Sequence, residues 1–130
     1  DELAKEFDLR LFIENSPDID PDPLANLMDT VKDERIGVCL DIGHANYSGT
    51  AIEVWFEKLK AHIGYLHLSD NKGRYDDHLA IGDGVVDWEL ADRLWRGLGR
   101  KTPMTLEVGN IDSVKKSIGF LRQNGYFGVV

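Results

Sequence analysis

Short apolar runs alternate along this chain with longer segments in which apolar residues recur every three or four positions. The short runs predict buried β-strands and the longer repeats predict amphipathic helices. Strands are expected at about residues 9–14, 37–42, 64–68 and 103–107. A helix after every strand favours parallel strands joined by right-handed crossovers. The pattern therefore predicts an α/β fold made of four (β/α) units.

The predicted helices each carry one apolar stripe. Asp22 and Pro23 are the expected start of the first long helix, Asp87 caps the third, and Gly125 ends the last. The tail of a helix is expected at residues 1–7, and a lid-like loop without regular structure at residues 69–86. The inward-facing positions are expected to be Leu24, Leu27, Met28 and Val31, then Ile52, Trp55, Phe56 and Leu59, then Trp88, Ala91, Trp95 and Leu98, then Ile111, Val114, Ile118 and Leu121.

Each predicted strand ends in a residue that can bind a metal: Glu14, Asp41, His67 and Glu107. In a (β/α) barrel the C-terminal ends of the strands meet on one rim and build the active site there. Three carboxylates and an imidazole on that rim form a site for a divalent cation, and Mn²⁺, Mg²⁺, Co²⁺ and Zn²⁺ all fit such ligands. A whole barrel takes about 250 residues, so these 130 residues are expected to form one domain that is half of a barrel.

Further polar residues lie close to these strand ends. His44 follows Asp41 across a turn that Gly43 permits, and Asp76 and His78 alternate, which in extended backbone places both on one side. The plainer interpretation is that strand-terminal acids cap helices and that Asp76, Asp77 and Asp83 form a solvated turn. His62 is interpreted as an ordinary histidine, and Cys39 and the tryptophans as core. Four strand ends with metal-binding groups favour the site.

Composition narrows the function classes. With 42% apolar and 29% charged residues the chain is typical of a globular protein. A formal charge of −8 disfavours a non-specific nucleic-acid binder, which needs a basic surface. A single cysteine, Cys39, favours a reducing, cytoplasmic setting, and no apolar run is long enough for a membrane span.

The blocks IENS, CLDIGHANYSG, HLSDNKGRYDDHLAIGDG and TLEVGN resemble the xylose isomerase-like barrel superfamily, over nearly the whole chain. That superfamily includes sugar-phosphate isomerases and epimerases, ketose 3-epimerases and endonuclease IV-type AP endonucleases. The resemblance implies the C-terminal half of the barrel, strands five to eight. It implies that Glu14, Asp41, His67 and Glu107 bind one metal ion and that Glu14 and Glu107 act as acid and base.

The resemblance also implies a function and a rival. The favoured function is a metal-dependent isomerase or epimerase of a sugar or sugar phosphate, acting by proton transfer through an enediolate. The resemblance places His44 near the substrate or a second metal, and we expect His44 and Lys72 to hold substrate hydroxyls or a phosphate. The rival is an AP endonuclease with a multi-zinc site, in which His44, Asp76 and His78 bind further metal. Asp77 and Leu79 replace an Arg and a His of the nuclease pattern, which favours the sugar enzyme. A third alternative is an inactive half-barrel that self-associates or pairs with the missing N-terminal half through its unpaired sheet edges.

Overall fold

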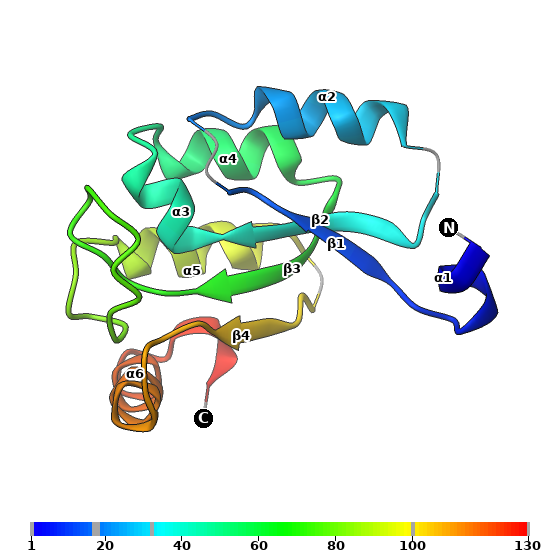
Figure 1. The fold of residues 1–130 in the computed structure, drawn as a ribbon. Coiled ribbons are helices and arrows are strands. Elements are labelled where there is room, and N and C mark those ends of the chain that lie inside the picture. The colour runs from blue at the N-terminus through cyan, green and yellow to red at the C-terminus, as the bar shows by residue number, and fades with distance from the viewer. Residues whose placement is uncertain (1, 17–18, 32, 100, 130) are drawn as a thin grey trace.

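Four parallel strands form one sheet in which neighbours in the chain are neighbours in space. The computed structural model describes residues 2–16, 19–31, 33–99 and 101–129. The strands are β1 (Leu11–Glu14), β2 (Ile36–Asp41), β3 (Ile63–Leu68) and β4 (Met104–Leu106), and the sheet order is β1-β2-β3-β4. All adjacent pairs are parallel, so the four C-terminal ends lie at one edge of the sheet (Figure 1). The predicted α/β fold with a helix after each parallel strand is confirmed.

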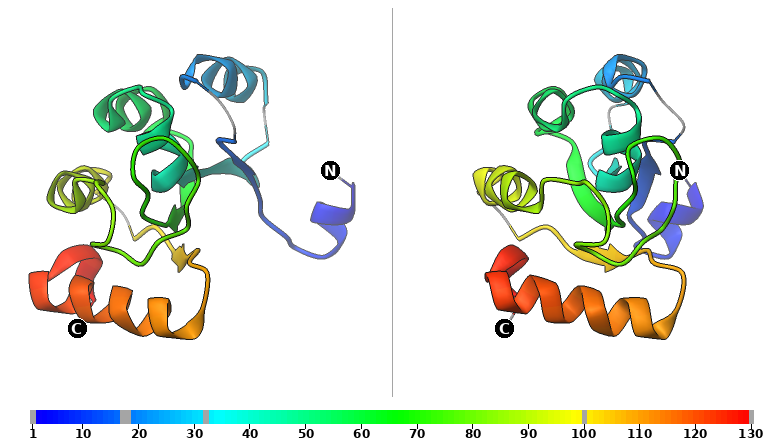
Figure 2. Two further views of the ribbon diagram at one scale, coloured as in Figure 1. Left: turned by 60° about the vertical axis from the view of Figure 1, so that its left-hand side comes forward. Right: turned by 90° about the vertical axis from the view of Figure 1, so that its left-hand side faces the viewer.

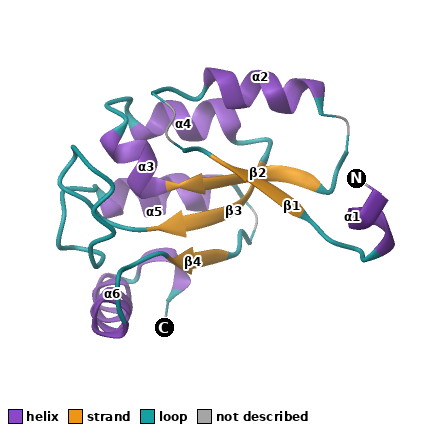
Figure 3. Ribbon diagram, viewed as in Figure 1, coloured by secondary structure: helices purple, strands orange, loops and turns teal. Residues whose placement is uncertain are grey.

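The helices lie mainly along one side of this sheet. Their bounds are α1 (Glu2–Glu6), α2 (Asp22–Thr30), α3 (Ile42–Tyr47), α4 (Ile52–Leu59), α5 (Trp88–Gly97) and α6 (Ile111–Asn124), followed by a 3-10 turn at Tyr126–Gly128. Seen along the strands, α2, α4, α5 and α6 form an arc outside the sheet, whereas α1 stands apart from it (Figure 2). The short helix α3 and the long loop lie at the C-terminal ends of the strands (Figure 3).

The core lies between the sheet and the arc of helices. Strand side chains alternate between two faces, and Val38, Leu40, Leu66 and Leu68 on the helix-facing side have essentially no exposed surface. Trp55 of α4 is buried among them. Burying an aliphatic side chain of this size contributes about 1.5–3 kcal/mol each, so this face supplies much of the stability.

The opposite face of the sheet carries a different set of side chains. Phe12 and Tyr65 pack with ring centroids 5.6 Å apart, and the Tyr65 hydroxyl lies 2.7 Å from Thr105 Oγ1. The Phe12 ring packs directly against Gly64. A Cβ atom at residue 64 would lie 2.4 Å from this ring, so there is no room for a side chain there. Phe12, Tyr65, Thr105 and Cys39 line a cavity of about 310 Å³, together with Glu14 and His67.

Several local predictions need correction. The side chain of Asp22 does not cap α2: Asp22 is the first helical residue, and its N–H donates to Asp20 Oδ1 instead. Leu27 and Ile111 face solvent, with 44% and 65% of their surface exposed, because each helix presents a narrower stripe to the core than its apolar pattern suggests. Ile42 begins α3, an unpredicted helix, rather than ending β2. Asp1, the first residue of the expected helical tail, lies outside the described residues.

Other helix signals are confirmed. Asp87 Oδ1 accepts the N–H of Leu90 at the start of α5. Gly125 follows α6 in the left-handed conformation, with φ of 67°, which glycine adopts at little cost.

The loop after β3 has structure of its own, contrary to the prediction. The backbones of Asp70 and Leu79 form an antiparallel bridge. The buried Asp70 carboxylate accepts four further bonds, from the N–H groups of Asn71, Gly82 and Val86 and from the indole of Trp88. One side chain therefore joins both ends of the loop.

Candidate metal centre

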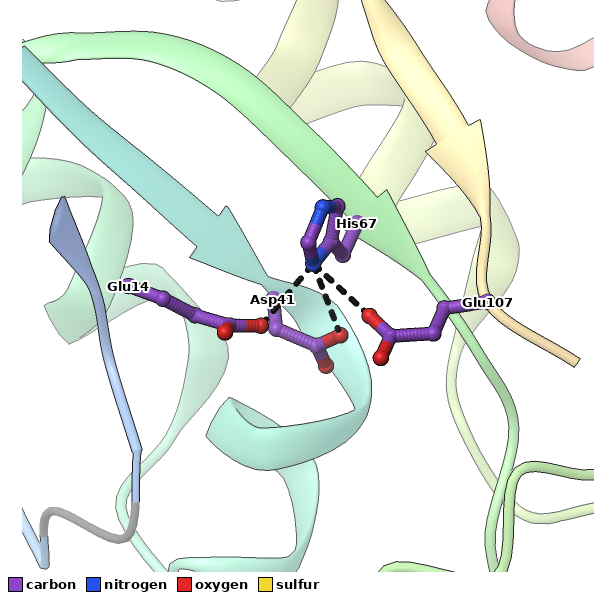
Figure 4. Close-up of side chains that lie close together, drawn as sticks. All are labelled: Glu14, Asp41, His67 and Glu107. Atoms are coloured by element: carbon purple, nitrogen blue, oxygen red, sulfur yellow. Dashed lines mark hydrogen bonds and ion pairs between the residues drawn. The ribbon is translucent and has the colours of Figure 1, made fainter. Parts of the chain in front are cut away.

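The four strand-end residues meet at one point. Glu14 and Asp41 are the last residues of β1 and β2, His67 is the penultimate residue of β3, and Glu107 directly follows β4. One ligand atom from each lies within 4.8 Å of the others (Figure 4). The parallel strands cause this convergence, because each delivers its terminal side chain to the same rim.

The imidazole of His67 lies at the centre of the cluster. Its Nδ1 lies 2.9 Å from Glu14 Oε1, 2.7 Å from Glu107 Oε2 and 4.0 Å from Asp41 Oδ2. Only the contact with Glu14 has hydrogen-bond geometry. Since Nδ1 carries at most one proton, it cannot satisfy three carboxylate oxygens.

Two carboxylate oxygens of the cluster remain unsatisfied. Asp41 Oδ2 and Glu107 Oε2 are buried and accept no hydrogen bond from the residues that the structure describes. Leaving a buried charged acceptor unpaired is costly, whereas a cation at this point would satisfy both oxygens. The donor set therefore fits a divalent metal ion, and three carboxylates with one imidazole suit Mn²⁺, Mg²⁺, Co²⁺ or Zn²⁺.

The electrostatics of Asp41 agree with this interpretation. Burial raises the pKa of its carboxyl group to about 6, and the neighbouring carboxylates Glu107 and Glu14 act in the same direction, although His44 opposes them. Its other oxygen, Oδ1, accepts the backbone N–H of His44 at 2.7 Å and caps α3. Asp41 is thus held by one oxygen while the other faces the cluster.

A second cluster adjoins the first and unites three predicted residues. Asp76 Oδ2 lies 3.2 Å from His44 Nε2 and 2.9 Å from His78 Nε2. His78 has φ of 48°, so the contact arises from a left-handed turn and not from the extended backbone that was predicted. The three residues nevertheless lie close together, and their binding of a second metal ion or of substrate stays a prediction.

The two histidines of this second cluster have the same orientation. His44 Nδ1 faces the backbone oxygen of Asn15 and His78 Nδ1 faces that of Glu107, each at 2.8 Å. A carbonyl only accepts, so each Nδ1 carries a proton and each Nε2 is directed at Asp76. This is the arrangement of metal-binding histidines, whose second nitrogen donates to a carbonyl.

Protons can occupy these Nε2 positions in the chain without metal. Burial opposes charging of His44, but Asp41, the Asn15 carbonyl and Asp76 together raise its pKa. The bond to the Glu107 carbonyl raises the pKa of His78, with a further contribution from Asp76.

Lys72 is oriented away from the role predicted for it. Its ammonium group donates to the backbone oxygen of Asp83, and its N–H donates to Asp77 Oδ2 at 2.9 Å. Both contacts lie within the loop, and neither involves a residue of the two clusters. Substrate binding by Lys72 remains a prediction.

Comparison with known proteins identifies the family. The family described as "Xylose isomerase-like TIM barrel" matches residues 1–124. The chain belongs to the xylose isomerase-like TIM barrel family. Its four strands and their helices are thus part of a TIM barrel.

The matching relatives include an epimerase-like protein, an uncharacterized protein and a probable endonuclease. The crystal structure of a D-tagatose 3-epimerase-like protein superposes with a TM-score of 0.84 at 29% identity, covering 94% of this chain and 49% of that one. An uncharacterized protein of Methanocaldococcus jannaschii is 31% identical over 94% of this chain and 44% of its own length. A probable endonuclease 4 of Mycobacterium tuberculosis is 31% identical over 78% of this chain and 42% of its own length. The chain thus spans about half the length of these relatives.

Two residues near the site were not identified from the sequence. Asn15 and Asp70 are each 1% exposed, and each bonds backbone groups that would otherwise be unpaired. Asn15 directly follows a strand-end ligand, and Asp70 lies in the polar run after β3. A polar residue next to a predicted ligand was the only signal available, and it does not distinguish a buried amide from a solvated one.

Among the residues that the structure describes, no helix is both long and apolar enough to cross a membrane.

Proposed function

We propose that this chain is the C-terminal half, strands five to eight, of a divalent-metal-dependent isomerase or epimerase that acts on a sugar or sugar phosphate. The observation that carries the proposal is the convergence of Glu14, Asp41, His67 and Glu107, with two buried carboxylate oxygens that accept no hydrogen bond from the described residues. Similarity to a D-tagatose 3-epimerase-like protein supports the sugar branch of the family.

In the proposed mechanism the four side chains hold the ion, and Glu14 and Glu107 also move protons. The ion would stabilise negative charge that develops next to a carbonyl group of the substrate, which makes the neighbouring C–H more acidic. Glu14 on β1 and Glu107 after β4 approach the cluster from opposite edges of the sheet (Figure 4). One carboxylate can therefore remove a proton from one face of the sugar while the other returns it to the opposite face.

Replacing one acid–base residue tests this proposal. We expect Glu107→Gln and Glu14→Gln each to lower turnover by about 10²- to 10⁴-fold, the usual contribution of general acid–base catalysis. Epimerase and isomerase turnover would be measured on a panel of ketoses and their phosphates with protein comprising the whole barrel. Glu57→Gln, on the exposed face of α4, is the matched control and should retain full turnover. Unchanged turnover in Glu107→Gln would refute its acid–base role.

A second candidate function rests on the cluster of His44, Asp76 and His78. Those three residues and the similarity to probable endonuclease 4 support a multi-zinc phosphodiester hydrolase that cleaves DNA at abasic sites. Asp77 between Asp76 and His78, and the net charge of −8, favour the sugar enzyme because they repel a polyanion.

Counting metal ions separates the two candidates. The sugar enzyme is expected to hold one ion per whole barrel and the nuclease three, as measured by elemental analysis of purified protein. Asp76→Asn should leave the metal content of the sugar enzyme unchanged and lower that of the nuclease.

A further inference from the structure

We propose that Asn15 is a positioning residue for the metal ligand Asp41. Its side-chain amide binds both the N–H and the carbonyl of Asp41 and so holds Asp41 in place for metal binding. This inference rests on the proposed metal site. It adds a residue that binds neither metal nor substrate and acts through a ligand.

The carboxamide of Asn15 bonds both polar backbone groups of Asp41. Asn15 Oδ1 accepts the Asp41 N–H at 2.7 Å, and Asn15 Nδ2 donates to the Asp41 carbonyl at 3.1 Å. The side chain is 1% exposed, so water does not compete for either bond. A single planar amide therefore sets both the position and the rotation of the Asp41 peptide groups.

The need for this contact follows from the lengths of the strands. The β1–β2 ladder ends with Glu14 opposite Cys39, two residues before β2 itself ends at Asp41. On this side Asp41 has no strand backbone to pair with, and buried backbone groups without partners are costly. The chain after β1 leaves the sheet at this point. The side-chain amide of Asn15 makes the hydrogen bonds to Asp41 that a further residue of β1 would otherwise make.

The backbone of Asn15 makes a contact of its own. Its carbonyl accepts His44 Nδ1 at 2.8 Å, which fixes the ring so that Nε2 is directed at Asp76. Asn15 thus touches Asp41 of the first cluster and His44 of the second. The contact with His44 uses the main chain, so a side-chain substitution at residue 15 acts directly on Asp41 alone.

Asn15 holds Asp41 in its metal-binding position before the ion binds, so its main effect should be on metal affinity. Asp41 already has Oδ1 committed to the His44 N–H, so a rotation of its peptide groups would displace Oδ2 from the cluster. Groups that orient metal ligands typically contribute about 10- to 100-fold to metal affinity. A purely structural asparagine would lower the stability of the fold but leave the affinity of the folded chain unchanged.

The test is Co²⁺ binding by the chain and by Asn15→Ala. Affinity would be measured by competition with a chelating dye, and coordination geometry by the visible absorption of bound Co²⁺. We expect Asn15→Ala to bind Co²⁺ about 10- to 100-fold more weakly with an altered spectrum. Asn15→Gln keeps the amide but moves it one methylene outward, so it should also weaken binding, and it remains informative should the alanine variant fail to fold.

Asp92→Ala is the matched control. Asp92 is a buried side chain that accepts a backbone N–H, from Phe127 at 2.6 Å, but it lies on α5 and touches no residue of either cluster. It should lower the free energy of unfolding and leave the Co²⁺ affinity and spectrum unchanged.

The outcomes distinguish this inference from the proposed function. Tight binding by the parent chain with equal affinity and spectrum in a folded Asn15 variant would overturn the role of Asn15 alone. Absence of Co²⁺ binding by the parent chain would overturn the metal site and this inference together.

Discussion

At the scale of the residue, burial raises the pKa of two groups at the candidate metal site, Asp41 and Cys39. Asp41 is fully buried beside two other carboxylates, and in the chain without metal its pKa rises to about 6. Above about pH 6 the metal-free site therefore holds an unfavourable negative charge, which a bound cation would stabilise. Stability of the fold and readiness to bind metal oppose each other at this position.

Removing the Asp41 charge should stabilise the metal-free chain. Because the pKa of Asp41 is higher in the folded chain than its ordinary value of 3.8, the unfolded chain loses this proton first as pH rises. The free energy of unfolding should therefore fall by up to about 3 kcal/mol between about pH 4 and pH 6, and it should stay low at higher pH.

We expect Asp41→Asn, which keeps the oxygen that caps α3, to abolish this fall. In EDTA at pH 7.5 it should exceed the parent in free energy of unfolding by about 1–3 kcal/mol, measured by urea denaturation. At pH 4 the two should be nearly equal. A variant less stable than the parent at pH 7.5 would contradict the account of Asp41.

Cys39 should be chemically inert in the folded chain. Burial, and then the charges of Glu14 and Asp41, raise the pKa of its thiol to about 12. The thiolate is the reactive form, so labelling by iodoacetamide at pH 8 should be at least about 100-fold slower than in denaturant. Mass spectrometry of timed samples measures both rates. Equal rates would show that the sheet face beside the cluster is open to solvent and reagent.

At the scale of the element, the strand ends supply the four predicted metal ligands, and the loop after β3 supplies Asp76 and His78 of the second cluster. Asp76 and His78 reach their partners because Asp70 binds both ends of that loop. Asp41 at the end of β2 caps α3, and Asp87 after this loop caps α5. Asp41 therefore serves both the local structure and the site.

Gly84 should be essential to this loop for a steric reason. A Cβ atom at residue 84 would lie 2.0 Å from Asp70 Oδ1 and 2.3 Å from the backbone oxygen of Asn71. Gly84→Ala should therefore destabilise the chain by about 1–3 kcal/mol and raise amide exchange in residues 70–86. Hydrogen exchange with mass spectrometry would locate the effect.

Gly97→Ala is the control for that substitution. Residue 97 ends α5, and a Cβ atom there would meet no described atom within 4 Å. Alanine at this position should be neutral or stabilise by up to about 1 kcal/mol. Equal effects at residues 84 and 97 would refute the steric explanation.

At the scale of the whole molecule, the sheet has two edges that pair with nothing among the described residues. β1 and β4 each have one neighbour, and the relatives are about twice as long as this chain. Unpaired strand edges promote association. We propose that the remaining half of a barrel, or a second copy of the chain, covers these edges.

The chain alone is therefore expected to self-associate. Sedimentation at increasing concentration should give masses above the 14.6 kDa of one chain. Leu11 lies on the β1 edge with 43% of its surface exposed, so Leu11→Lys should weaken association by placing a charge there. Ile111→Lys, on an exposed position of α6, should not. A monodisperse 14.6 kDa species at all concentrations would contradict this expectation.

Much of this arrangement could be predicted from the sequence, because strand ends and apolar periodicity are local signals. Glu14, Asp41, His67 and Glu107 each end an apolar run, and parallel strands necessarily bring such ends to one rim. Leu27 and Ile111 show the limit of periodicity, since which part of an apolar stripe is buried depends on how the helix packs.

The sequence by itself determined the order of the strands and of the longer helices, the parallel sheet and the residues at its rim, because these follow from spacing and from which side chains can be buried. Only the tertiary structure decided that the Asn15 amide binds the backbone of Asp41 and that the Asp70 carboxylate joins the two ends of the loop after β3. It also decided that His44 and His78 are both directed at Asp76. Those contacts join residues 12 to 32 positions apart in the chain, or depend on one left-handed residue, His78. Such contacts depend on distances that no local pattern encodes.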